Sequence, residues 1–422
     1  MPLTLSQAID LALKQNRDLR LAQLAVVDSQ HKKEVARSAY FPHITNQSEI
    51  LHITDLAGVQ IPAGAFGNHA DTGPIPGQNL FLDQGALTSY TSGTGLTQPL
   101  TQMFKIRASN RAATADINMA REEVTQTENT VALKVRQLYY GILIAQLKQQ
   151  AAAEEVSASQ VKVEESMSDV ERGNALDVVV LEGRASVLDA RQSALTQRLQ
   201  IHDLTISLND LLGLPLNTEL ALSAEASPTP IPIPSREECI RIAQEHSPQI
   251  QSAKQSVLKA KAGLSAANDA YIPDITGLAR YSYQSGIPFL VHNFGTFGVS
   301  FSYDLFDGGK RVAEVKDSKT LFSEAELNLA KVEDEVAVQV ETAYDKVEQL
   351  QDLAGVAAEA LKAREEASRV TDRRFEQNAA LASDRAEARA KALSTRASYL
   401  EATLGLSLAQ GDLKRTMGQL PR

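Results

Sequence analysis

Apolar residues recur every three or four positions through two long stretches of this chain. The first stretch, residues 104–172, contains no proline and only one glycine, Gly141. The second, residues 322–361, repeats the same pattern. At a rise of ~1.5 Å per residue, the first stretch alone would form a helix roughly 100 Å long, which no ordinary globular domain contains. Because alanine and valine are frequent at the apolar positions, the pattern predicts close-packed coiled coil.

A second pattern, with a period of two, predicts β-strands. In residues 296–305 every second side chain is apolar, and those between are glycine or small polar residues. The apolar set is Phe297, Val299, Phe301, Tyr303 and Leu305. Residues 275–284 alternate less regularly, and a more polar pair of strands is predicted at 44–53 and 87–100. Alternation of this kind is typical of a strand with one apolar face.

Residues that end helices stand at matching places in the two halves. Gly173 follows the first long stretch and Asn378 follows the second, 205 residues later. Glycine and asparagine are the two residues best suited to a left-handed helix stop. Antiparallel helices are therefore predicted to return along 175–212 and 381–417. A single opening helix in each half is predicted to end at a proline, because the residue before proline avoids the helical conformation.

The chain contains two copies of one pattern. Residues 3–44 align without gaps on 234–275 at an offset of 231, with matching Ala-Tyr-x-Pro-x-Ile segments at their ends. Residues 100–213 align on 305–418 at an offset of 205. Two long collinear blocks are hard to obtain by chance, so the internal duplication is real.

The duplication predicts the domain organisation. The first repeat, 1–225, carries 26 extra residues, most of them in a Gly- and Pro-rich loop at 56–85. A proline-rich connector, 226–234, leads to the second repeat, 235–422. Each repeat is predicted to fold as a helix, two strands, a very long helix, a turn and a returning helix.

Composition excludes several classes of protein. A formal net charge of −10 and a pI near 5.4 argue against nucleic-acid binding, which needs a basic footprint. The single cysteine, Cys239, excludes an intramolecular disulfide framework. No stretch approaches the ~18 to 20 apolar residues of a membrane-spanning helix. No secretory signal precedes the first helix either, so the protein is either cytoplasmic or has lost its signal.

The sequence offers no catalytic or metal-binding constellation. The seven histidines are scattered, without metal-ligand spacing on one helix face. Asp307-Gly308-Gly309-Lys310 lacks the spacing of a phosphate-binding loop and favours a turn with an aspartate helix cap. No Ser/His/Asp or Cys/His set emerges. We therefore expect no enzymatic activity, no cofactor and no metal.

The ordered set of motifs resembles the TolC-like outer-membrane efflux proteins over essentially the whole chain. Besides the duplication and its turns, the resemblance rests on Gln98-Pro99-Leu100 and on the segment from Tyr303 to Arg311. It implies a mainly α fold with a β-barrel portion: a homotrimer whose subunits each give four strands to a 12-stranded barrel in outer-membrane lipid. Twelve helices would continue the barrel as a periplasmic tunnel. One departure is Gln102-Met103-Phe104, where the second repeat has Asp307-Gly308-Gly309.

The resemblance also implies a function and partners. The protein would be a passive exit channel of a tripartite efflux or type I secretion system, exporting small molecules or proteins. Its partners would be a periplasmic adaptor protein and an inner-membrane pump. Elementary physics supports an oligomer, because four strands cannot close a barrel and unpaired strand edges in hydrocarbon cost several kcal/mol per group.

The two hairpin turns are the predicted docking tips for the adaptor. They would stand ~100 Å from the barrel, nearest to an inner-membrane partner. The predicted tip residues are Arg172, Gly173, Asn174 and Leu176 in the first repeat, and Asn378, Ala379 and Leu381 in the second. The alternative is that these residues only close tight turns.

Two acidic residues after the second turn are the predicted pore gate. Asp384 and Glu387 stand six and nine residues after Asn378, and their spacing of three projects them from nearly the same helix face. In the resembled family, acids at about these offsets ring the narrow periplasmic mouth. Three copies of each would attract cations. The first repeat has Val179 and Glu182 at the matching offsets, so the full pair is confined to the second repeat.

Other interpretations stay open at this point. Asp384 and Glu387 could instead form ion pairs with Arg385 and Arg389 on a solvated helix face. A periplasmic adaptor also has a long helical hairpin, but only one, between β-rich domains. A trimeric coiled-coil scaffold without a membrane barrel would explain the helices but not the strands with an apolar face.

Overall fold

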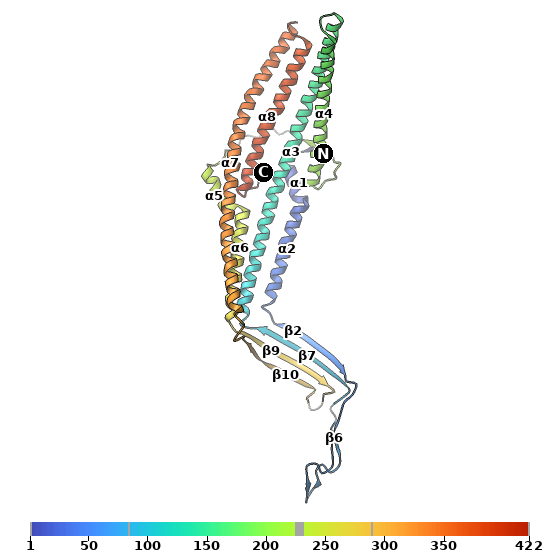
Figure 1. Ribbon diagram of the computed structural model, residues 1–422, viewed down its shortest axis with the longest axis vertical. Coiled ribbons are helices and arrows are strands. Elements are labelled where there is room, and N and C mark those ends of the chain that lie inside the picture. Colours follow the sequence, from blue (N-terminus) through green and yellow to red (C-terminus); the bar gives the residue numbers. More distant parts are fainter. Residues whose placement is uncertain (1, 83–84, 224–231, 288–289, 421–422) are drawn as a thin grey trace. The chain divides into compact units, whose positions relative to one another are not determined.

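The computed structural model describes residues 2–82, 85–223, 232–287 and 290–420, and Figure 1 labels many of their helices and strands. The chain divides into two compact units. The helical unit comprises Met1–Ser29, Asp116–Val257 and Glu324–Arg422. The sheet unit comprises Gln30–Ala115 and Leu258–Ser323. Each unit takes segments from both repeats. Most of the connector, residues 226–231, lies outside the described residues.

The opening helix of the first repeat is broken once, so the prediction of one uninterrupted helix is wrong. Helix α1 spans Leu5–Gln15 and α2 spans Arg17–Ser38. Between them Asn16 adopts an extended conformation, and its backbone N–H donates to the Ala12 carbonyl at 2.8 Å. Its side-chain Oδ1 accepts from the Leu19 N–H at 3.0 Å. Asn16 therefore ends one helix and caps the next.

The same break recurs 231 residues later, in the second repeat. Helix α5 spans Arg236–His246, α6 spans Pro248–Asn268, and Ser247 lies extended between them. The cause differs here, because Pro248 disfavours the helical conformation at Ser247 and is itself well suited to start a helix. A short 3₁₀ turn, Asp269–Tyr271, follows α6 before the chain enters the sheet.

The very long helices and their hairpins are confirmed (Figure 1). The long helices are α3, Met103–Glu171, and α7, Lys310–Glu376. The returning helices are α4, Asp177–Leu211, and α8, Ala382–Thr416. The predicted left-handed stops are also confirmed, since φ is +76° at Gly173 and +54° at Asn378.

Two clusters of buried apolar side chains stabilise the helical unit. One surrounds Tyr139 of α3, which is 1% exposed and whose hydroxyl lies 3.0 Å from the Leu3 carbonyl oxygen and 2.8 Å from that of Ser223. Leu3 belongs to, and Ser223 directly follows, a short parallel pairing between β1, Pro2–Leu3, and β8, Ala221–Leu222. The other cluster packs α7 against α5 and α8. Each long helix thus has a core near its middle, and the core around Tyr139 also includes Leu404 of α8.

The sheet unit contains a four-stranded antiparallel sheet in the order β10-β9-β7-β2. Its strands are β2, His43–His52; β7, Thr88–Pro99; β9, Asp274–Ser285; and β10, Asn293–Ser302. All four strands are thereby confirmed. The predicted last strand is too long, however, because Tyr303 and Leu305 follow its end; Asp307, the cap of α7, draws this segment into a turn.

The two faces of this sheet differ in polarity. On β10, Phe297, Val299 and Phe301 lie on one face and are 90%, 68% and 66% exposed. The opposite face carries Thr296, Gly298 and Ser300, because neighbouring residues of a strand point to opposite sides. Within the described residues, the outer strands β2 and β10 have no neighbour on their far sides.

The loop at 56–85 is more ordered than a plain Gly- and Pro-rich loop. In its described residues, β3, Val59–Ile61, pairs with β6, Leu80–Leu82. Further out, β4, Asn68–His69, pairs with β5, Gly73–Pro74. The first copy's extra residues therefore form a narrow extended hairpin rather than an irregular segment.

The strand-to-helix turn before α7 has the predicted aspartate cap. Asp307 accepts hydrogen bonds from the Gly309 N–H at 3.0 Å and from the Arg311 N–H at 3.1 Å. The Arg311 Nε also donates to it at 2.7 Å, and these hydrogen bonds lower the pKa of Asp307 to about 2. Gly308 and Gly309 have φ of +68° and +88°, which explains the glycine pair.

Candidate functional site

The first predicted tip is a tight turn held by its own backbone. The Gly173 N–H donates to the Val170 carbonyl at 2.9 Å, and the Asn174 N–H donates to the Asp169 carbonyl at 2.8 Å. The Arg172 guanidinium donates to the Ser168 hydroxyl at 2.7 Å. A Cβ at Gly173 would meet no atom within 4 Å, so space is open there. These hydrogen bonds hold the turn, and there is room outside it for a contacting side chain.

The second tip repeats this backbone arrangement. The Asn378 N–H donates to the Phe375 carbonyl at 2.9 Å, and the Ala379 N–H donates to the Arg374 carbonyl at 2.7 Å. Each tip then exposes one leucine just before its returning helix, at positions 205 residues apart. Leu176 is 75% exposed and Leu381 is 61% exposed. Both repeats thus present an apolar side chain that the fold itself does not use.

The two predicted gate acids have different local partners. Asp384 accepts a hydrogen bond from the Leu381 N–H at 3.2 Å, which caps the first turn of α8. Glu387 pairs with Lys391, one helical turn further on. This hydrogen bond lowers the pKa of Glu387, and the nearby Lys162 of α3 adds to the effect. Among the described residues no cation pairs with Asp384, so its charge is the less neutralised of the two.

The alternative pairing of these acids with Arg385 and Arg389 is wrong. Both arginines instead reach back across the hairpin to Asp372 of α7, with Nε–Oδ1 distances of 2.8 Å and 3.0 Å. The Arg385 guanidinium also lies over the Phe375 ring, 4.8 Å from its centroid. The hydrogen bond from Arg385 lowers the pKa of Asp372.

Sequence reasoning missed Asp372, although a signal for it exists. In an antiparallel hairpin, residues equally far before and after the turn face each other. Asp372 lies six residues before Asn378 and Arg385 seven residues after it. Opposite charges at such mirrored positions predict an ion pair. Lys162 carries no comparable signal, because it approaches Glu387 from the other hairpin.

A groove of about 270 Å³ lies beside the predicted gate residue Glu387 and is lined by residues of both repeats. It lies between α3, α4 and α8, and both Glu182 and Glu387 line it. These glutamates occupy equivalent positions in the two repeats. The sequence shows only this equivalence, whereas the structure places both side chains at one groove. Ser383 closes one side, and its N–H donates to Glu165 of α3 at 3.1 Å.

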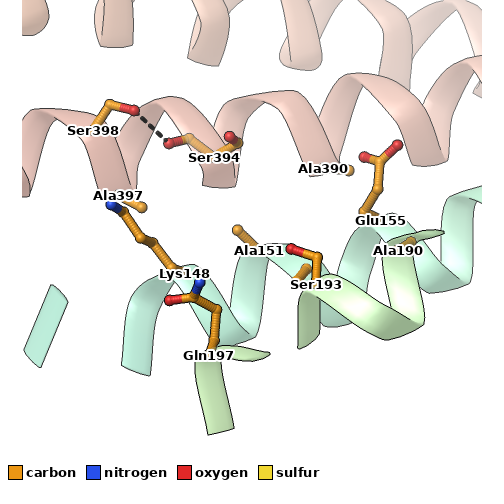
Figure 2. A pocket seen from close by; sticks show the side chains of 11 residues that line it. Lys148, Ala151, Glu155, Ala190, Ser193, Gln197, Ala390, Ser394, Ala397 and Ser398 are labelled. Carbon is orange, nitrogen blue, oxygen red and sulfur yellow. Dashed lines mark hydrogen bonds between the residues drawn. The ribbon is translucent and has the colours of Figure 1, made fainter. Parts of the chain in front are cut away.

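A second groove, of about 350 Å³, separates the same three helices further from the turns. Figure 2 shows Ala151 and Glu155 of α3 facing Ala390 of α8, with Ser193 of α4 on the same side as Ala151. An ion pair of 2.8 Å between Lys148 of α3 and Glu401 of α8 spans this interface. The small side chains that line this groove allow the helices to pack closely. The lining residues do not form a recognisable group of catalytic residues.

The polar face of the sheet carries one guanidinium. Arg280 of β9 lies directly across from Gly95 of β7. A Cβ added to Gly93 would come within 2.4 Å of an Arg280 nitrogen, so the guanidinium lies flat over this glycine. Within the described residues Arg280 has no carboxylate partner. This face of the sheet therefore carries a guanidinium near Gly93 and Gly95.

In the described part of the chain, no helix is long and apolar enough to cross a bilayer. No three His, Cys, Asp or Glu side chains there lie close enough together to hold a metal ion.

Removing the carboxylate that joins the two helices of the second hairpin should loosen that hairpin. In Asp372→Asn, Arg385 and Arg389 lose their common ion pair. The three side chains are 28% to 49% exposed, so we expect a loss of only ~0.2 to 1 kcal/mol. Amide hydrogen exchange in the first turns of α8 should accelerate up to about fivefold.

The control for this change is Asp352→Asn, which removes an exposed carboxylate from the same helix. Because the pKa of Asp372 is lowered in the folded chain, its contribution is present above the ordinary aspartate pKa of 3.8 and is lost as pH falls through the lowered value. Equal exchange in parent and Asp372→Asn at neutral pH would show that the ion pair does not hold the hairpin.

Comparison with known proteins gives one consistent result. The profile of the family described as outer membrane efflux protein matches residues 8–214 and 239–419. The outer membrane efflux protein BepC of Brucella suis biovar 1 (strain 1330) is 25% identical over 354 residues, which is 82% of this chain and 70% of that protein.

Solved structures share the fold. The outer-membrane channel OprN superposes with a TM-score of 0.77 at 17% identity, covering 98% of this chain and 89% of that one. The CmeC outer membrane channel of Campylobacter jejuni gives a TM-score of 0.75 at 16% identity, covering 98% and 85%. Two repeats, each with strands and a long hairpin, are therefore a known architecture.

Proposed function

This chain belongs to the outer membrane efflux protein family, and from that premise we propose that three copies enclose one passive duct leading out of the cell. The family consists of outer-membrane efflux channels with helices that extend into the periplasm, and it is not a family of enzymes. The observation that carries the proposal is the four-stranded sheet, with one exposed apolar face and two unpaired edges among the described residues.

Closure of the sheet between copies accounts for both features. Unpaired backbone groups in hydrocarbon cost several kcal/mol each, so β2 of one copy must pair with β10 of the next. Three copies supply twelve strands. The face of Phe297, Val299 and Phe301 then meets lipid, and the face of Arg280 lines the water-filled interior. A coiled-coil scaffold without a membrane part has no use for that apolar face.

The helical hairpins supply the remaining parts of the duct. The long helices of the three copies together form the periplasmic tunnel. Two exposed leucines per chain at the hairpin turns, Leu176 and Leu381, support docking of a periplasmic adaptor that couples the duct to an inner-membrane pump. Asp384 and Glu387 form the cation-attracting ring at the periplasmic mouth. A single-hairpin adaptor is disfavoured because this chain has two hairpins.

Cysteine labelling on one strand tests the membrane wall. In a Cys239→Ser background, we expect Ser300→Cys to react with a membrane-impermeant maleimide in reconstituted channels. Val299→Cys, its neighbour on β10, should react at least ~10-fold more slowly, because lipid raises the thiol pKa and each unit removes about nine-tenths of the reactive thiolate. In detergent-free denaturant both should react alike. Equal rates in the bilayer would exclude the proposed wall.

A further inference from the structure

Each repeat brings the break in its opening helix against the end of its returning helix. In the first repeat the break lies at Asn16 and the returning helix, α4, ends at Leu211. In the second repeat the break lies at Ser247 and the returning helix, α8, ends at Thr416. The two breaks correspond at the offset of 231, and the two helix ends at the offset of 205. These contacts, the first joint and the second joint, are built from equivalent positions with different side chains.

Glycines that follow the returning helices make a close approach possible at both joints. A Cβ added to Gly213 would lie 3.1 Å from Gln15, the residue before the first break. A Cβ added to Gly418 would lie 2.2 Å from the carbonyl oxygen of His246, the residue before the second break. The ends of α4 and α8 therefore meet the two breaks in the same way.

At the first joint every carbonyl at the end of the returning helix has a donor. The last four carbonyls of a helix lack partners within the helix, so donors must come from elsewhere. The carbonyls of residues 208–210 accept from the backbone N–H groups of residues 212–214, which follow α4. The fourth, that of Leu211, accepts from the side-chain Nδ2 of Asn16 at 3.4 Å. The side chain at the break thus completes the end of α4.

At the second joint one of these four hydrogen bonds is missing. The carbonyls of residues 413–415 accept from the N–H groups of residues 417–419, as in the first repeat. The fourth carbonyl, that of Thr416, corresponds to the one that Asn16 serves, but Ser247 has no amide to donate. Nothing else among the described residues donates to it. Because Thr416 is 7% exposed, an unpaired carbonyl there would be costly.

A small polar cavity lies at the same place. Its volume is about 20 Å³, and Ser247 and Thr416 both line it. Asn129 of α3 lines it as well, is 3% exposed, and its Nδ2 has no partner among the described residues. One buried water needs ~10 to 15 Å³ and two to four polar partners. The cavity therefore has the size and the polar groups that one water molecule requires.

The groups around the cavity favour a neutral occupant. Arg415 lines the cavity, but its guanidinium pairs with Asp412 at 2.9 Å. An anion would leave the Thr416 carbonyl without a donor. A cation would face the unpartnered N–H of Asn129. A water molecule can donate to the one and accept from the other.

We propose that one buried water molecule takes the place of the Asn16 amide at the second joint. The water donates to the Thr416 carbonyl and accepts from Asn129 Nδ2, and the Ser247 hydroxyl is the third polar group beside it. The first joint is thus completed by a side chain and the second by an exchangeable molecule. The inference goes beyond the proposed function and does not depend on the assembly of three copies.

High-resolution crystallography of the full chain tests the site directly. In the parent we expect one isolated density peak at ~2.7 to 3.2 Å from both Asn129 Nδ2 and the Thr416 carbonyl oxygen. In Ser247→Asn the new amide should reach that carbonyl, and the peak should disappear. In Asn16→Ser a new peak should appear beside the Leu211 carbonyl. The two variants exchange the side chains of the two joints, so each is the control for the other.

Amide hydrogen exchange measures whether the water stabilises the second joint. Asn129→Leu nearly keeps the side-chain volume but removes the donor that holds the water. Protection of the amides of residues 417–419 should then fall about 2- to 13-fold, the value of one hydrogen bond. In a dry cavity the same change would remove an unpaired N–H, and protection would stay equal or rise. The matched control, Asn118→Leu, lies ~16 Å away along α3 and should leave these amides unchanged.

Three results would overturn the proposal. One is a parent structure that shows other buried waters but no density in this cavity. Another is equal or higher protection in Asn129→Leu. The third is a peak that gains an anomalous signal after a bromide soak, because the occupant would then be an anion.

Discussion

Efflux should be lost when the two exposed tip leucines are replaced by serine. Leu176 and Leu381 contribute little to folding, because they are 75% and 61% exposed. Burying one leucine at a docking surface is worth ~1.5 to 3 kcal/mol, which corresponds to about 10- to 150-fold in affinity. With three copies of each tip in a trimer, Leu176→Ser with Leu381→Ser should remove measurable coupling to the adaptor.

Two measurements check this expectation. Cells that depend on this channel should become as sensitive to exported toxic compounds as cells lacking it. Purified trimers should keep their melting temperature and conductance. The matched control is Leu216→Ser, which removes another exposed leucine, 55% exposed, outside the turns. Full resistance in cells with the doubly substituted channel would place adaptor docking elsewhere.

Substitutions at Gly173 distinguish a surface effect from a strained turn. Because φ is +76° there, any residue with a Cβ meets backbone strain, although open space surrounds the position. Asparagine tolerates this conformation and occupies the equivalent place, Asn378, in the second repeat. Gly173→Asn should therefore keep both hairpin and efflux. Gly173→Val should cost ~1 to 2 kcal/mol locally and impair docking by distorting the turn.

Much of this fold is predictable from sequence because its signals are local and long. A heptad-like pattern sustained over the 69 residues of α3 specifies one helix whatever packs against it. Gly173 and Asn378 end the hairpins through their own backbone preference. Asn16 escaped prediction because the apolar pattern continues across it, and only a side-chain cap interrupts the helix. The extended hairpin within 56–85 was not predicted because its strands are only two or three residues long. Such short strands leave no alternating pattern in the sequence.

The candidate gate was predictable only in part. The spacing of Asp384 and Glu387 could be read from the chain, but not which cations neutralise them. In the sequence, Arg385 and Arg389 lie next to these acids and far from Asp372. Both side chains nevertheless project toward α7, where Asp372 accepts hydrogen bonds from them. Which partner the two arginines reach depends on which side of α8 faces α7. That side is set by how the two helices pack. The approach of Lys162 to Glu387 depends on packing between different hairpins.

We expect Asp384 to contribute more than Glu387 to the cation selectivity of the proposed gate. Arg385 and Arg389 are engaged by Asp372, so they are not placed to offset the charges of the two acids. Glu387 keeps its charge to lower pH because its pKa is lowered, but Lys391 offsets that charge locally. Asp384 has no cation partner among the described residues. Three Asp384 carboxylates around one axis should therefore supply most of the attraction for cations.

We expect Asp384→Asn to reduce cation selectivity in planar bilayers more than Glu387→Gln does, and the double variant to reduce it most. Asparagine keeps an acceptor for the Leu381 N–H, so the helix cap survives and only the charge is removed. Each lost charge-assisted contact is worth ~1.5 to 3 kcal/mol, so block by multivalent cations should weaken by about 10- to 150-fold. Both effects should be largest at low salt, where screening is weakest.

Glu182→Gln is the matched control, because Glu182 lines the same groove as Glu387 but belongs to the first repeat. It should leave selectivity and block nearly unchanged if the second repeat alone forms the mouth. Equal losses in Glu182→Gln and Glu387→Gln would mean that the whole groove, and not a ring of second-repeat acids, attracts the cations. Unaltered selectivity and block in the double variant would show that the mouth lies at other residues. Removing six formal charges from a constriction must change the electric field that ions cross there.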